Sequence, residues 1–82
     1  MVNKYENYQL WRVDLIHRNG YHAPYQLIEV NLQTDKNGYK LAHKIVTNRK
    51  LRLLDFPEKW SFSLMQLDKV KINGKWIDRG LL

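Results

Sequence analysis

The sequence predicts a small α+β protein, a single domain over residues 1–82, with one helix packed across an antiparallel sheet in the order ββαβββ. Three observations predict this fold. Two Asn-Gly pairs stand between runs that alternate in polarity, a central segment has helical periodicity, and a later segment alternates large apolar residues with serines. An all-β meander is the alternative if the central segment is extended.

The first Asn-Gly pair, Asn19-Gly20, predicts a hairpin over about residues 8–32. A two-residue type I′ turn at this pair would place Trp11 opposite Ile28. Two apolar stripes then share one face of the sheet, which supports the register because a slip of one residue would separate them. The stripes are Trp11, Val13 and Leu15 on one strand and Ile28, Val30 and Leu32 on the other.

The central segment, residues 39–47, is compatible with a helix or with a strand. As a helix, its apolar residues fall on one arc at 100° per residue, and Asn37 would cap its N-terminus. As a strand, residues 35–38 would form a turn, but alternation separates apolar from basic residues less cleanly. The helix is therefore favoured. Its apolar arc would carry Tyr39, Leu41, Ala42, Ile45 and Val46.

The C-terminal third predicts three more strands. Residues 60–64 read WSFSL, an alternation typical of a strand with one wet face. The second Asn-Gly pair, Asn73-Gly74, lies within KVKINGKWID and predicts a terminal hairpin over residues 69–78. The core side of that hairpin would carry its apolar residues Val70, Ile72 and Ile77.

The position of Trp76 depends on the length of this turn. With two residues in the turn, Trp76 pairs with Lys71 and lies on the face opposite the core. An aromatic ring among lysines is how binders of single-stranded nucleic acid stack bases. With three residues and a bulge, Trp76 would lie beside Val70 in the core.

The charge of the chain predicts an acidic partner. Fourteen Lys and Arg against eight Asp and Glu give a net charge of +6, with a pI near 9.7, which is typical of nucleic-acid-binding domains. An acidic protein surface would serve equally. The candidate nucleic-acid-binding residues are Lys69, Lys71, Lys75, Trp76 and Arg79 on and after the terminal hairpin, Arg49, Lys50 and Arg52 at the end of the predicted helix, and Lys40 and Lys44 on its polar face.

Other classes of site have little support in the sequence. There is no cysteine, and the type I′ register would pair His17 with His22, two ligands where a zinc site needs at least three. No nucleophile stands in a catalytic setting, and phosphate-binding glycine motifs are missing. We therefore expect no metal, no cofactor and no enzymatic activity. No stretch is long and apolar enough for a membrane span or a secretory signal, so a cytoplasmic protein is expected.

Size and composition add one further hypothesis. A short Lys-, Asn- and Tyr-rich chain without catalytic motifs is common among accessory proteins of phages and mobile elements, which would act in the host cytoplasm. The leading hypothesis is a non-enzymatic nucleic-acid-binding module. The alternative is an inhibitor or adaptor that docks on a partner protein, such as a phage anti-defence (anti-CRISPR-like) protein, because aromatic and arginine residues are enriched at interface hot spots.

Overall fold

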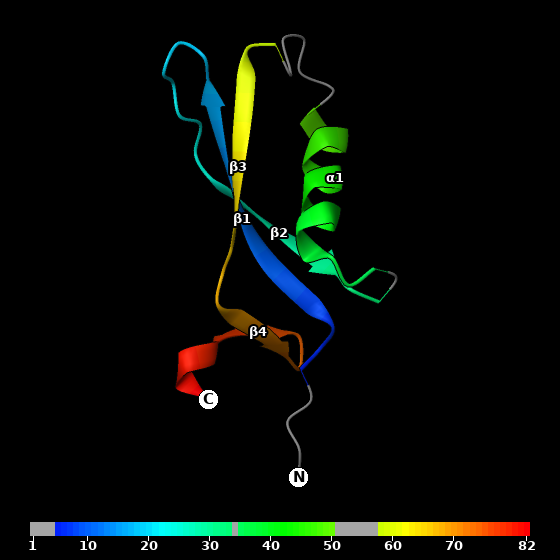
Figure 1. Ribbon diagram of the computed structural model, residues 1–82. Helices are drawn as coiled ribbons and strands as arrows, with labels where there is room; N and C mark the ends of the chain where they lie inside the picture. Colours follow the sequence, from blue (N-terminus) through cyan, green and yellow to red (C-terminus); the bar gives the residue numbers. More distant parts are fainter. Residues whose placement is uncertain (1–4, 34, 51–57) are drawn as a thin grey trace.

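A computed structural model, which describes residues 5–33, 35–50 and 58–82, confirms the α+β class and the order ββαβββ (Figure 1). Strands β1 to β3 form one antiparallel sheet in the order β2-β1-β3, and β4 pairs with β5 in a second. No helix in the described part of the chain has the length and apolar character needed to cross a membrane. The elements are β1 (Tyr8–His17), β2 (Gln26–Asn31), α1 (Gly38–Lys50), β3 (Trp60–Gln66), β4 (Lys69–Ile72), β5 (Lys75–Asp78) and a short 3₁₀ helix, η1 (Arg79–Leu81).

The main register of the first hairpin is the predicted one, with Trp11 opposite Ile28. The predicted pairing of His17 with His22 is wrong: the His17 N–H donates to the Tyr21 carbonyl oxygen at 2.8 Å, and His22 bridges to the residue before His17. The sequence-based register was therefore correct along the strands and shifted by one residue at the turn.

The shift has its cause in the turn residues. A type I′ turn needs positive φ at both central positions, but only Gly20, at φ 94°, adopts it here; Asn19 does not. The Gly20 N–H donates to the His17 carbonyl oxygen at 2.8 Å, as in a longer turn that ends on a left-handed glycine. One additional residue in the irregular stretch around Pro24, which has no N–H to donate, restores the predicted register before β2 begins.

Helix α1 covers one face of the three-stranded sheet (Figure 1). It begins where predicted, because Asn37 Oδ1 accepts a hydrogen bond of 3.0 Å from the Lys40 N–H and satisfies a donor that the first turn leaves without a partner. The apolar arc of the helix meets the two predicted stripes of the hairpin. Buried in this core are Trp11, Val13, Ile28, Val30, Ala42 and Val46.

The predicted terminal hairpin has the two-residue turn, the first of the two alternatives, with φ 53° at Asn73 and 78° at Gly74. Lys71 accordingly pairs with Trp76. Strand β4 follows β3 and lies beside the chain just before β1, where the Glu6 N–H donates to the Lys71 carbonyl oxygen at 2.8 Å. The hairpin therefore lies beside the start of β1, at the same end of the molecule as the C-terminus (Figure 1).

Candidate nucleic-acid interface

Trp76 lies between the two positions that the sequence left open. Its indole N–H donates a hydrogen bond of 2.6 Å to Glu29 Oε1 on β2, and its side chain is only partly exposed. The ring faces away from the Val70 side of the hairpin, as a two-residue turn requires, but it packs within the fold. Trp76 thus ties β5 to β2, two strands that are not neighbours in either sheet.

Lys71 belongs to the same contact. Its ammonium lies 3.1 Å from Glu29 Oε1, 4.5 Å from the centre of the Tyr8 ring and 5.8 Å from that of Trp76, and its side chain is only 16% exposed. Hydrogen bonds from Trp76 and from Lys71 lower the pKa of the Glu29 carboxyl, and the bond from Trp76 has the larger effect. Lys71 was a predicted phosphate contact, but its ammonium is already used in contacts that attach the terminal hairpin to β1 and β2.

The remaining hairpin cations have exposed acidic neighbours or none. Lys69 lies 2.9 Å from Asp78 on the paired strand, and Arg79 lies 2.9 Å from Asp68. Lys75 is exposed and has no ion pair within the described residues. Its cross-strand neighbour is Ile72, so Lys75 lies on the other face of the hairpin from Lys71. Ion pairs at an exposed surface contribute at most about 1 kcal/mol, so an anionic ligand can compete for these cations.

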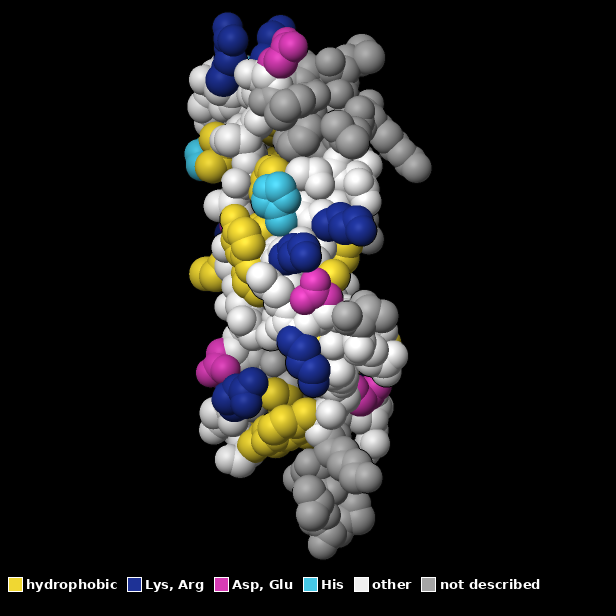
Figure 2. Space-filling view, turned by 45° about the vertical axis from the view of Figure 1, so that its right-hand side comes forward, with side chains coloured by type: hydrophobic (Ala, Val, Ile, Leu, Met, Phe, Trp, Pro, Cys, Tyr) yellow, Lys and Arg dark blue, Asp and Glu magenta, His cyan; other side chains and the backbone are white. Residues whose placement is uncertain are grey.

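The predicted helix cations lie apart from the hairpin. Lys40 and Lys44 are exposed on α1, with the Lys40 ammonium 3.5 Å from Asp35. The side chains of Arg49 and Lys50, and the whole of Arg52, lie outside the described residues. On the face in Figure 2, basic side chains are spread along the length of the molecule with acidic ones between them. The predicted cations thus form no continuous patch on this face.

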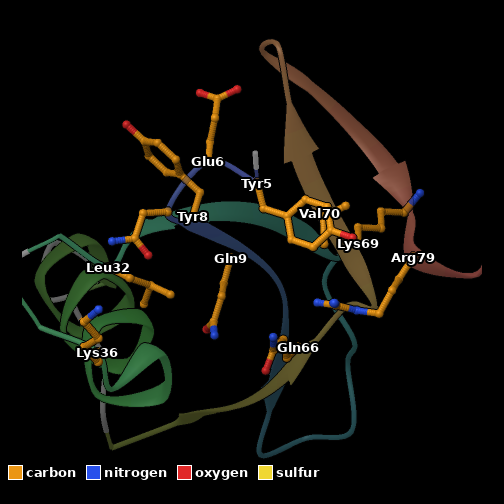
Figure 3. A pocket seen from close by; sticks show the side chains of 11 residues that line it. Tyr5, Glu6, Tyr8, Gln9, Leu32, Lys36, Gln66, Lys69, Val70 and Arg79 are labelled. Atoms are coloured by element: carbon orange, nitrogen blue, oxygen red, sulfur yellow. The ribbon is translucent and has the colours of Figure 1, made fainter. Parts of the chain in front are cut away.

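A pocket of about 360 Å³ opens between the start of β1, the loop before α1 and the terminal hairpin (Figure 3). Three cations from three separate segments line it: Lys36, Lys69 and Arg79. Two of these were predicted, and Lys36 was not. The remaining lining residues are Tyr5, Glu6, Asn7, Tyr8, Gln9, Leu32, Gln66 and Val70.

The side chains of the pocket differ in direction. Gln9 and Gln66 extend from the sheet into the hollow, and the Arg79 guanidinium points inward beneath Tyr5, 6.0 Å from the centre of its ring (Figure 3). Lys69 is directed toward β5, where its acidic partner lies. The interior is therefore lined by amides and one guanidinium, and the Lys69 ammonium lies at the rim.

The position of Gln9 is fixed by its neighbours. Its Oε1 accepts a hydrogen bond of 3.0 Å from the Trp11 indole N–H. Gly38, the first residue of α1, leaves room for this amide, since a Cβ at that position would lie only 1.8 Å from Gln9 Oε1. With its oxygen occupied by Trp11, Gln9 presents its NH₂ group as a donor.

Sequence reasoning missed most of this pocket. Tyr5, Gln9, Lys36 and Gln66 carry no motif, and they meet only because β4 continues along the start of β1. Arg79 was predicted as a binding residue because it directly follows the predicted terminal hairpin. Loop and strand-end residues such as Lys36 and Gln66 have no periodic pattern that would bring them together.

Comparison with known protein families, with curated proteins and with solved structures found no match to this chain. Within the described residues, no three histidine or acidic side chains are grouped so that they would hold a metal ion. The candidate interface consequently stands on its geometry and charge.

Proposed function

We propose that this protein is a small non-enzymatic nucleic-acid-binding module whose interface is centred on the pocket beside the terminal hairpin. One observation carries the proposal: Lys36, Lys69 and Arg79, from three separate segments, line a hollow that Tyr5 and two side-chain amides also line. A net charge of +6 supports it, because phosphate neutralisation supplies most of the affinity of such proteins. A cytoplasmic location in a phage-infected host would suit such a module.

The contacts are electrostatic in the first instance. Phosphates would replace Asp68 at Arg79 and Asp78 at Lys69, exchanging weak exposed ion pairs for a polyanion. Lys36 has no ion pair within the described residues. Such contacts place a chain of phosphates without reading sequence.

The test is the affinity for fluorescent oligonucleotides, single-stranded and duplex, measured by anisotropy over a range of salt concentrations. We expect the logarithm of the binding constant to fall linearly with the logarithm of the salt concentration. Lys36→Ala and Arg79→Ala should each reduce the slope by about 0.7 to 0.9, the share of one phosphate contact. No binding at low ionic strength would sink the proposal.

Matched controls lie at the opposite end of the molecule. Arg18 and Lys59 are exposed cations joined by a backbone hydrogen bond of 2.7 Å from the Arg18 N–H, far from the terminal hairpin (Figure 1). Arg18→Ala and Lys59→Ala change the net charge as the pocket variants do. If they weaken binding as much as Lys36→Ala and Arg79→Ala, the pocket is not the interface.

The alternative function, docking on a partner protein, has its own supporting observation. On the sheet face opposite α1, Leu27 and Met65 flank Arg12 and are 49% and 51% exposed. Tyr25 lies beside them, with its ring centre 4.2 Å from the Arg12 guanidinium. Aromatic residues, methionine and arginine are enriched at interfaces.

An inhibitor or adaptor that used this face would retain a host protein from nuclease-treated lysate. Met65→Lys should abolish that retention, whereas Asn48→Lys, on the exposed side of α1, should not. Retention by both variants would exclude this face as the docking surface.

A further inference from the structure

The pocket has a feature that phosphate binding alone does not use: two side-chain amides face its interior. Gln66 is the last residue of β3 and pairs with Trp11 of β1, so it shares a face of the sheet with Gln9, two residues from Trp11 along the strand. Both amides point into the hollow (Figure 3). Amides match donors and acceptors on the edge of a base, and Gln9, whose oxygen already accepts from Trp11, would take part as a donor.

An aromatic ring stands at the mouth of the same hollow. Tyr5 lines the pocket and is 51% exposed, with the Arg79 guanidinium beneath it. Tyr8, which also lines the pocket, already has the Lys71 ammonium against its ring. The Arg79 guanidinium lies farther from the Tyr5 ring, 6.0 Å from its centre against 4.5 Å for Lys71 and Tyr8, and Tyr5 is the more exposed of the two residues. Tyr5 is therefore the more accessible ring for a ligand, and the arginine beside it adds a cation for the adjacent phosphate.

The position of these groups decides between a duplex and a single strand. Both amides point into the hollow, with Gln9 partly buried and Gln66 exposed, while the Lys69 ammonium points away from it toward β5 (Figure 3). Bases within a duplex are stacked and paired, so their edges do not reach into a pocket. Unpaired bases can be turned out of the strand, stacked on a ring and hydrogen-bonded at their edges.

We propose that the pocket holds one unpaired base of a single-stranded nucleic acid. The base edge contacts the Gln9 and Gln66 amides, its face stacks on Tyr5, and the flanking phosphates lie at Arg79 and Lys36. This inference rests on the proposed nucleic-acid-binding function and adds the class of ligand, single strands rather than duplexes.

The first test uses variants that leave the charge unchanged, Gln66→Ala and Tyr5→Ala, with anisotropy of single-stranded and duplex oligonucleotides as the readout. Tyr5→Ala should weaken single-strand binding at least about fivefold, since loss of a stacked base contact has effects of that order or larger. Gln66→Ala should weaken it by a similar factor of about five, since it removes an amide contact to the base edge. Binding to duplex and the salt slope should stay the same. The control is Gln26→Ala, an exposed amide at the start of β2, which should change neither.

A second test needs no variant. In a ¹H–¹⁵N spectrum of the wild-type protein, the side-chain amide signals of Gln9 and Gln66 should shift when a single-stranded oligonucleotide is added, while those of Gln26 and Gln33 should not. Absence of these selective shifts would contradict the proposal.

The outcomes separate the two proposals. If no oligonucleotide binds at low salt, the proposed function fails, and this inference fails with it. If oligonucleotides bind but duplex binds as tightly as single strand, or Gln66→Ala and Tyr5→Ala behave like Gln26→Ala, the base pocket is wrong and the electrostatic interface remains.

Discussion

The Trp76 indole N–H donates a hydrogen bond of 2.6 Å to Glu29 Oε1, and the Lys71 ammonium lies 3.1 Å from the same oxygen. One carboxylate therefore receives two donors from the two strands of the terminal hairpin. Glu29 itself is on β2, across β1 from that hairpin. This contact explains why the aromatic ring on a basic hairpin is held toward β2 by its N–H and is only partly exposed.

Glu29 should make the stability of the fold depend on pH. Its pKa in the folded protein lies below the ordinary value of 4.5, because Trp76 and Lys71 both stabilise the charged carboxylate. A group with a lowered folded pKa stabilises the fold above its unfolded pKa, and that contribution is lost as the pH falls through the folded pKa. Urea unfolding at pH 7 and at successively lower pH should show the loss for the wild-type protein. Glu29→Gln should be less stable at pH 7 and should lose less on acidification; parallel curves would contradict the assignment.

The sequence predicted the registers well because turn residues and apolar stripes determine them together. Asn73-Gly74 forms the predicted hairpin with the two-residue turn, so Lys71 lies opposite Trp76, as that alternative required. At Asn19-Gly20 the same dipeptide formed a longer turn, and an additional residue near Pro24 compensated for it. Local turn geometry was therefore less predictable than the pairing of stripes, which the buried core enforces.

The candidate site was much less predictable. Pairing Lys71 with Trp76 was within reach of the sequence, but their joint contact with Glu29 depends on how the chain brings β5 to β2. Lys36 and Gln66 meet in the pocket for the same reason. Charge composition alone also could not show which cations have acidic neighbours in the fold. Lys69 and Arg79 both have one.

The second Asn-Gly turn should be sensitive to its glycine. Gly74 has φ 78°, a conformation that costs a residue with a side chain about 1–2 kcal/mol. Gly74→Ala should therefore lower the free energy of unfolding by about that amount in urea denaturation. Gly80 is the matched control, because it has no positive φ and open space around its Cα. Gly80→Ala should stay within about 0.5 kcal/mol of wild type, and an equal loss in both variants would contradict the argument.

The cap of α1 should contribute measurably to stability. Asn37 Oδ1 accepts the Lys40 N–H at 3.0 Å, so Asn37→Ala should cost about 1 kcal/mol. Asn48, exposed near the other end of the helix, provides a control for the change from asparagine to alanine. Asn48→Ala should be neutral or stabilising by up to about 0.7 kcal/mol, since alanine has the higher helix propensity. Thermal or urea unfolding measures both, and a comparable loss in Asn48→Ala would show that the cap is not the cause.

Gly38→Ala should destabilise the protein through Gln9. A Cβ at position 38 would lie 1.8 Å from Gln9 Oε1, so the flexible amide must move, and we expect it to lose its hydrogen bond from the Trp11 indole N–H. Trp11 is only 7% exposed, and leaving a buried donor unsatisfied costs about 1–3 kcal/mol.

A double-mutant cycle isolates this contact. In a Gln9→Ala background the obstacle is gone, and Gly38→Ala should instead stabilise the fold by about 0.4–1 kcal/mol by restricting the unfolded chain. A change of sign between the two backgrounds, measured by urea unfolding, is the expected result. The same effect of Gly38→Ala in both backgrounds would mean that Gln9 does not occupy this position.

Because displacing Gln9 also removes a donor from the pocket, Gly38→Ala should weaken single-strand binding while leaving its salt slope unchanged.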